Sequence, residues 1–193
     1  FNRTQDQKSH SSVTSDNIEG GYTAAQFLCS AGHKRIAYIG GWAGASTQRD
    51  REAGFCSGLK KSGQILFARA LGDFSTDIAK DVTREMFAAS SRPDAVFVAT
   101  DHMAFAVMDV LRSELGLSIP ADVSVVGYDD VPPSSWAGYN LTTLRQRANL
   151  MVEKTVRLMI DKIRDPDVAP MHLKINSPLI VRGSAKIPEG WST

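Results

Sequence analysis

The sequence is short of cysteine, carries no excess of either charge and contains no long hydrophobic run. Its 193 residues include two cysteines, and 22 Lys and Arg stand against 21 Asp and Glu, giving a formal net charge of +1. Because binding to a polyanion needs clustered cations, this balance argues against the chain itself binding nucleic acid. No apolar run approaches the roughly 18 residues of a membrane span, so we expect no membrane partner.

The sequence also lacks the common signatures of catalysis and of metal binding. The four histidines have no HExxH or other ligand spacing, and there is no GxSxG elbow and no P-loop. The stretch 40–44 is rich in glycine but does not fit GxGxxG, and no acid follows a second strand at the distance that dinucleotide binding needs. Cys29 and Cys56 lack CxxC spacing, which predicts free, buried thiols. We therefore expect no catalytic residue, no metal and no cofactor.

The rest of the predicted fold is organised around one stretch, residues 119–130, with the sequence IPADVSVVGYDD. Its β-branched apolar run around Val125 predicts a strand that is buried on both faces. We expect Gly127 to let the chain turn, with Asp129 and Asp130 just past the strand's carboxyl end. In open α/β sheets, ligands bind at that edge. Two interpretations stand: Asp129 holds a small polyol, or both acids are solvated turn residues.

Strand and helix patterns alternate along the chain at roughly 25–30 residues per unit, the spacing of βαβ crossovers. The expected strands cover residues 13–15, 36–39, 67–71, 95–100, 123–126, 171–175 and 178–181, and the expected helices cover 16–28, 48–61, 75–86, 101–111 and 150–163. Asp101 is expected to cap the fourth helix, and a stripe of Ile78, Val82 and Met86 to form the inner face of the third. The fold class that follows is α/β with a doubly wound parallel sheet.

Side chains suited to binding hydroxyl groups gather at the expected strand ends and helix starts. These residues are Arg51, Phe74, Thr100, Asp101 and Asp129. Carboxylates and a guanidinium hydrogen-bond vicinal hydroxyls, and an aromatic face packs on a sugar ring. Without a nucleophile–base pair, such a set describes binding and not turnover. The alternatives are a core position for Phe74 and a solvated helix charge for Arg51. His102, in the first turn of a helix, could reach a cleft, although a surface helix position is favoured.

Seven motifs along the chain carry a resemblance to a known family. They are VTSDNIEGGYTAAQFL (13–28), GHKRIAYIGG (32–41), QRDREAGF (48–55), RPDAVFVATDHMAFAVM (92–108), IPADVSVVGYDD (119–130), LTTLRQ (141–146) and LIVRGS (179–184). In this order and spacing, the chain resembles the effector-binding part of a LacI/GalR-type bacterial transcription regulator. The fold of that family is the fold of type I periplasmic sugar-binding proteins.

The resemblance implies two subdomains that are joined by three chain crossings, with the effector in the cleft between them. It divides the chain into a remnant of the N-terminal subdomain (1–13), a C-terminal effector-binding subdomain (14–141), a return to the N-terminal subdomain (142–176), and a final strand and tail (177–193). We expect the full gene product to be longer, and apolar surface to be left near Phe1 and around 150–163.

The effector-binding residues that the resemblance implies are Arg51, Asp129, Phe74, Thr100, Asp101, Gln146, Asn2 and Arg3. Arg51 and Asp129 are the leading ligands, and Phe74 is the stacking aromatic residue. Gln146 lies at a crossing near the ligand. Thr100 departs from the usual Asn-Asp pair, because threonine offers one hydroxyl where asparagine offers both a donor and an acceptor.

The resemblance also implies partners: a sugar or sugar derivative as effector, and a homodimer through the C-terminal subdomain that uses Trp136, Phe105 and Ser135. Operator DNA would be bound by a helix-turn-helix head that is absent from this chain. The protein would be a cytoplasmic repressor and not an enzyme. Two alternatives stay open, a periplasmic sugar-transport receptor and, with less support, an enzyme on this fold. A Trp136 side chain tucked into its own core is the alternative to an interface.

Overall fold

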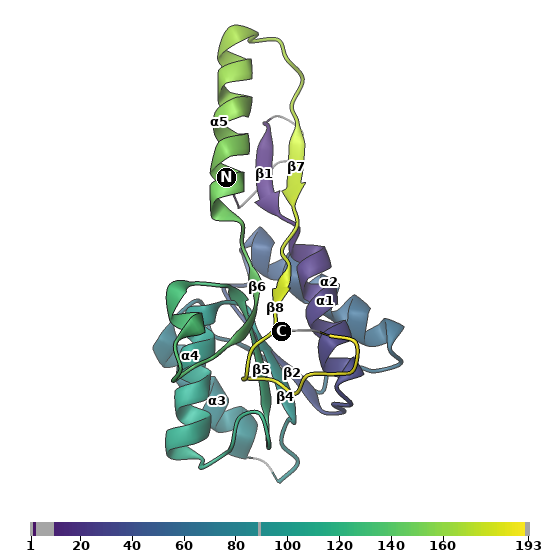
Figure 1. Cartoon of the computed structure of the whole chain (residues 1–193), viewed down its shortest axis with the longest axis vertical. Coiled ribbons are helices and arrows are strands. Elements are labelled where there is room, and N and C mark those ends of the chain that lie inside the picture. Colours follow the sequence, from purple (N-terminus) through teal and green to yellow (C-terminus); the bar gives the residue numbers. More distant parts are fainter. Residues whose placement is uncertain (1, 3–9, 89, 192–193) are drawn as a thin grey trace.

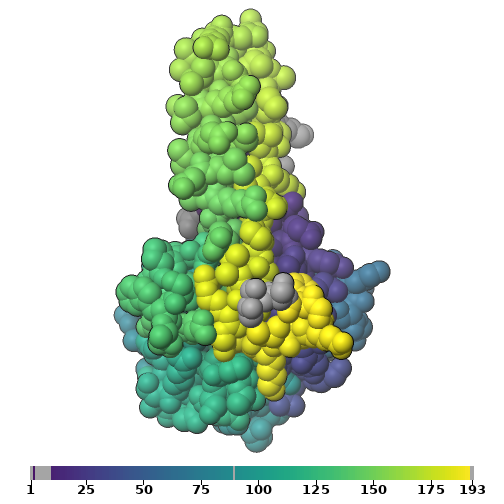
Figure 2. All heavy atoms as spheres, in the orientation of Figure 1, coloured from purple at the N-terminus to yellow at the C-terminus, as the bar shows by residue number. Residues whose placement is uncertain are grey.

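The computed structural model describes residues 2, 10–88 and 90–191 and has two parts (Figure 1). The larger part, which we call the body, is built on a six-stranded sheet. The smaller part, which we call the arm, consists of strand β1 (Ser12–Ser15), helix α5 (Ala148–Arg164) and strand β7 (His172–Ile175). The arm protrudes from the body as a narrow column (Figure 2).

The body sheet has the strand order β3-β2-β4-β5-β6-β8. The strands are β2 (Ile36–Gly40), β3 (Ala68–Leu71), β4 (Ala95–Val98), β5 (Ser124–Asp129), β6 (Thr142–Arg145) and β8 (Leu179–Ile180). All neighbours pair in parallel except β8, which runs antiparallel to β6. Because β4 pairs with β2 and not with β3, the strand order reverses between β2 and β4. The expected doubly wound α/β sheet is confirmed, with one antiparallel edge strand.

Helices cover both faces of this sheet (Figure 1). Helices α1 (Asn17–Ser30) and α2 (Ser46–Lys61) lie on one face, and α3 (Thr76–Ala88) and α4 (Asp101–Asp109) lie on the other. Between the layers, the rings of Tyr38, Phe55 and Phe97 have centroids 5.0–5.7 Å apart. The inner face of α3 is formed by Ala79, Thr83 and Phe87, one residue along from the expected stripe.

Glycines allow α1 and α2 to pack backbone against backbone. A Cβ atom on Gly54 would lie 1.9 Å from the Ile18 carbonyl oxygen, and one on Gly21 would lie 2.1 Å from the Arg51 carbonyl oxygen. Real side chains never approach a backbone atom so closely, so only glycine fits at these two positions. The close approach fixes the position of α2, and therefore of Arg51, relative to α1.

The C-terminal segment completes the body. The Ser184 side chain accepts a hydrogen bond from the Thr142 N–H (2.8 Å) and donates one to the Val125 carbonyl (2.6 Å). The Trp191 ring packs edge-on against Phe27 of α1, with centroids 5.2 Å apart. In the structure, β6 and residues 178–191 belong to the body, and β1 extends the arm to Ser15. The division of the chain into subdomains stays a prediction.

The arm has a small core of its own, formed by Val13, Met151 and Ile175. The outer side of α5 leaves large apolar side chains exposed: Val152, Val156, Met159, Ile160 and Ile163. The apolar surface expected around 150–163 is confirmed, while Phe1 lies outside the described residues. Within the described ranges, no helix combines the length and the apolar character needed to cross a membrane.

Candidate effector site

A cavity of about 270 Å³ lies where the carboxyl ends of the body strands face the crossings to the arm. Its lining residues are Asn2, Thr47, Arg51, Phe74, Thr100, His102, Asp129 and Gln146. This is the edge of the sheet where the strand order reverses, the usual ligand position in doubly wound folds. The structure brings together six of the predicted residues and adds Thr47 and His102. Arg3 lies outside the described residues, and Asp101 is not in the lining.

Arg51 enters the cavity from the first half of α2 and is only 3% exposed. Its Nε donates a hydrogen bond to Asn17 Oδ1 (2.8 Å), and its Nη1 donates one to the Ala99 carbonyl. The guanidinium carbon lies 3.5 Å from the centre of the Tyr128 ring, a cation–π contact. Two hydrogen bonds use only part of a guanidinium's five donors, so others remain for a ligand.

Asp129 is the last residue of β5, and its φ of 130° departs from the strand. Its Oδ1 lies 3.8 Å from Arg51 Nη2 and accepts a hydrogen bond from Gln146 Nε2. Burial of the carboxylate raises the pKa of Asp129 to about 6, against the opposing effects of Arg51 and Gln146. The side chain is therefore charged at neutral pH and titrates just below it.

The two ligand candidates belong to a closed ring of polar contacts that we call the hinge ring: Asp129, Gln146, Ser15, Asn17 and Arg51. Ser15 Oγ donates to Gln146 Oε1 (3.0 Å), and Asn17 Nδ2 donates to the Ser15 carbonyl (3.0 Å). Ser15 ends the arm strand β1, and Gln146 follows the body strand β6. The cavity groups are thus connected to two of the three chain crossings.

Phe74, Thr100 and Gln146 are held by their local backbone. Phe74 has a φ of 59°, and its ring lies so close to Gly41 that a Cβ there would be 2.1 Å away. Thr100 is the N-cap of α4, and its hydroxyl accepts from the Met103 N–H (3.5 Å). The Gln146 N–H donates to the Asp129 carbonyl (3.1 Å). These constraints present one aromatic face and several hydroxyl or amide groups to the cavity.

Asp101 is neither a cap nor a lining residue, and both expectations for it were wrong. It is fully buried, and its carboxylate accepts hydrogen bonds from Ser134 Oγ (2.6 Å), Thr143 Oγ1 (2.6 Å) and the Val131 N–H (3.0 Å). Gly127 likewise lies inside β5 and makes no turn; a Cβ there would be 2.3 Å from Asp101 Oδ1. Asp101 joins α4 to β6 and to the loop after β5.

A Ser–His–Asp arrangement lies at the opposite, amino end of the sheet. His33 Nε2 is 2.8 Å from Ser124 Oγ, and His33 Nδ1 is 3.3 Å from Asp94 Oδ1. Ser124 is fully buried, and its oxygen accepts a hydrogen bond from the Lys186 N–H (2.9 Å). A serine that no substrate can reach cannot act as a nucleophile, so this cluster holds the C-terminal segment against β5.

The residues expected at a dimer interface lie on one surface around the 3-10 turn Pro132–Ser135. Trp136 is 60% exposed, and the Ser135 hydroxyl bonds the Pro132 carbonyl (2.9 Å). Phe105 is mostly buried and stacks on Tyr139, with centroids 4.3 Å apart. Trp136 is therefore not tucked into its own core.

The cavity is equipped to bind a small hydroxylated molecule. Its described lining includes one guanidinium, one carboxylate and the imidazole of His102. Across residues 2, 10–88 and 90–191, no cluster of His, Cys, Asp or Glu has the make-up of a metal site. Cys29 and Cys56 are free thiols, as expected, but both are only partly buried and not buried as predicted.

A family model described as a periplasmic binding protein-like domain matches residues 25–185, most of the chain. The chain belongs to this periplasmic binding protein-like family. Within it, the chain is 37% identical over 177 residues to the HTH-type transcriptional regulator CelR of Thermobifida fusca, covering 89% of this chain and 51% of CelR. It is 33% identical over 175 residues to the ribose operon repressor of Escherichia coli (strain K12), covering 90% and 53%.

Solved structures of periplasmic binding protein-like proteins agree with these relatives. A complex of the transcriptional regulator CelR with cellobiose superposes with a TM-score of 0.86 at 35% identity, covering 93% of this chain and 55% of that one. A lac repressor dimer bound to operator and the anti-inducer ONPF gives 0.84 at 28% identity, covering 90% and 60%. The predicted resemblance to LacI-type effector domains is confirmed. The chain spans about half the length of the curated relatives it matches, and these relatives are named as regulators and repressors.

Proposed function

We propose that this chain is the effector-sensing domain of a DNA-binding transcription regulator of the repressor type, and that it binds a sugar-like ligand in the cavity between body and arm. The observation that carries this proposal is the shared cavity of Arg51 and Asp129, with Phe74 beside them. A charged donor, a charged acceptor and an aromatic face recognise a hydroxylated ring. The names of the relatives support regulation over transport.

Binding would be coupled to movement through the hinge ring. A ligand hydroxyl that donates to Asp129 competes with Gln146, which reaches the same carboxylate from a chain crossing. A ligand shifts a conformational equilibrium only by its differential affinity for the two states. The hinge ring makes the affinity for the ligand differ between the two states, because its contacts depend on the position of the arm. In the complete regulator, acting in the cytoplasm, this movement would change how a separate head contacts operator DNA.

We propose that the protein is not an enzyme. The described residues that line the cavity include no serine, cysteine or lysine, and the buried Ser124 has no access to a substrate. The ligand would therefore be released chemically intact, as a signalling function requires.

The proposal predicts pH-dependent sugar binding. Because burial raises the pKa of Asp129 to about 6, its carboxylate is lost as the pH falls through that value, and with it an acceptor for ligand hydroxyls. In a thermal-shift screen of cellobiose, ribose and other sugars, a saturating ligand should raise Tm by about 5–10 °C at pH 7.5. By isothermal titration calorimetry, its affinity should fall by up to about tenfold at pH 5.

Two variants test whether Asp129 causes the pH dependence of binding. Asp129→Asn should bind weakly and without pH dependence, because its amide does not ionise. His102 lines the same cavity. The control His102→Gln should keep the pH dependence. If no sugar shifts Tm at pH 7.5, the sugar-binding proposal is wrong.

We also propose a homodimer through the body surface that carries Trp136. Exposed tryptophans are frequent anchors of interfaces, and truncating such an anchor costs about 2 kcal/mol or more. Trp136→Ala should therefore weaken dimerisation by about thirtyfold, measured by sedimentation velocity over a concentration series. Trp42, which is 53% exposed on a different loop, provides the matched control Trp42→Ala. An unchanged profile for Trp136→Ala would remove this residue from the interface.

A further inference from the structure

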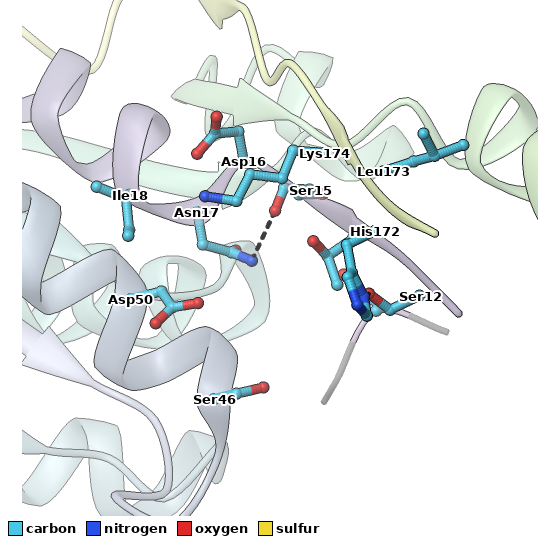
Figure 3. Close-up of a pocket in the computed structure, with 12 residues that line it drawn as sticks. Ser12, Ser15, Asp16, Asn17, Ile18, Ser46, Asp50, His172, Leu173 and Lys174 are labelled. Atoms are coloured by element: carbon cyan, nitrogen blue, oxygen red, sulfur yellow. Dashed lines mark hydrogen bonds between the residues drawn. The ribbon is translucent and has the colours of Figure 1, made fainter. Parts of the chain in front are cut away.

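The structure has a second cavity, of about 250 Å³ (Figure 3). It is bounded on one side by the arm, through Ser12 and His172, and on the other by α2, through Ser46 and Asp50. Asn2 lines both cavities. We call this second cavity the outer compartment. Both spaces are therefore parts of one cleft between arm and body.

The first turns of α2 divide the cleft. Ser46 and Asp50 are four residues apart and line the outer compartment, while Thr47 and Arg51 are four residues apart and line the effector cavity. Residues at i and i+4 lie on the same side of a helix, so one helix presents two parallel polar edges. A ligand that lies across this helix end contacts both edges at once.

The side chains of the outer compartment suit hydroxyl groups. Asp16 and Asp50 supply two carboxylates, against a single lysine, Lys174. Within the described residues no group bonds the Asp50 carboxylate, which is half-buried. Two acids against one cation disfavour an anionic group and favour a neutral one that donates hydrogen bonds. Ile18 adds an apolar surface for the C–H face of a ring.

Asn2, at the border, has an acceptor that the protein does not use. Its Nδ2 donates to Gln146 Oε1 (3.2 Å), but its buried Oδ1 has no hydrogen-bond partner among the residues that the structure describes. A buried polar atom without a hydrogen-bond partner destabilises the protein, so a ligand hydroxyl that donates to this oxygen would add to the binding free energy. The border between the two spaces is therefore itself a point of recognition.

We propose that the ligand is a neutral disaccharide, with one ring in the effector cavity and the second in the outer compartment, and with a hydroxyl near Asn2. This inference rests on the proposed function, because it extends the same site. Size supports it: each space alone is smaller than the roughly 300–1,000 Å³ typical of small-molecule sites, and the two together fall within that range.

The test compares disaccharides with their own monosaccharides. Calorimetry would measure cellobiose against glucose, and lactose against galactose, on the unchanged protein, on Asp50→Asn and on the control Asp109→Asn, which changes an exposed acid on α4. We expect the tightest ligand to be a disaccharide. Loss of a hydrogen bond to a charged acceptor predicts that Asp50→Asn weakens that disaccharide by about ten- to hundredfold and its monosaccharide by less than about twofold.

The outcomes separate this inference from the proposal on which it rests. If a monosaccharide binds as tightly as its disaccharide, or if Asp50→Asn affects both to the same extent or neither, the outer compartment is not part of the site while sugar binding stands. If none of the four sugars binds at millimolar concentration, the sugar-binding proposal falls and the inference falls with it.

Discussion

Lysine in place of Arg51 should weaken effector binding at least about a hundredfold. The guanidinium is buried, stacks on Tyr128 and bonds Asn17 and Ala99, so its plane and its remaining donors are fixed before a ligand arrives. An ammonium group offers a single charged point and no planar fork. Losing two charge-assisted hydrogen bonds to a ligand corresponds to roughly 3 kcal/mol or more. Calorimetry at pH 7.5 with the best ligand from the screen would measure the change.

The same substitution removes the hydrogen bonds that Asn17 Oδ1 and the Ala99 carbonyl accept from Arg51, so the fold must be checked separately by circular dichroism and urea titration. Arg49 offers a matched control, because it is an exposed arginine two residues earlier on α2 that bonds only the Gly44 carbonyl within the described chain. Arg49→Lys should bind normally. A folded Arg51→Lys protein with unchanged affinity would remove this residue from the ligand site.

Alanine in place of Gly54 should destabilise the protein by roughly 3 kcal/mol or more, because overpacked cores commonly lose that much. In an exposed helix this change would be stabilising by about 1 kcal/mol. Here the new Cβ would lie 1.9 Å from the backbone of Ile18, and no side-chain rotation can relieve that contact. Helices α1 and α2 must move apart. For a domain of this size, Tm should fall by about 6–12 °C, measured by calorimetry.

Gly138 provides the matched control for the same chemical change. A Cβ at Gly138 meets nothing within 4 Å, and its φ is not in the left-handed region. Gly138→Ala should therefore change the unfolding free energy by less than about 0.5 kcal/mol. Equal stability of the Gly54→Ala and Gly138→Ala proteins would show that the two helices are not packed as closely as described.

The sheet was predictable because its central strands are short apolar runs followed by polar residues. The same pattern located the site: Thr100 and Asp129 follow buried strands, and parallel strands bring their carboxyl ends to one edge. Gln146 and Asn2 came only from the resemblance, since neither follows a distinctive pattern. Six predicted residues share the cavity, and whether they bind a ligand stays a prediction.

The residues that the sequence reasoning missed have physical explanations. Thr47 was taken for loop because α2 begins after Ala45, which offers no side-chain cap, so nothing marks the start of the helix. Asp101 and Thr100 are neighbours, and no local signal tells which side chain faces the ligand and which is buried against Ser134 and Thr143. No local signal shows that β6 pairs with β5 and with β8, which lies far along the chain.

The contribution of the C-terminal segment to the body has a consequence for biosynthesis. Val181, Ala185 and Trp191 pack into a core that also holds residues from much earlier in the chain, among them Phe27. A domain that folds as its chain leaves the ribosome normally closes from the N-terminus. Here the sheet gains β8, and Ser184, which bonds Val125, only after residues 179–184 have been synthesised. A nascent chain stalled before β8 would leave the β6 edge bare, and recruitment of a chaperone to such chains should cease once residue 191 has emerged.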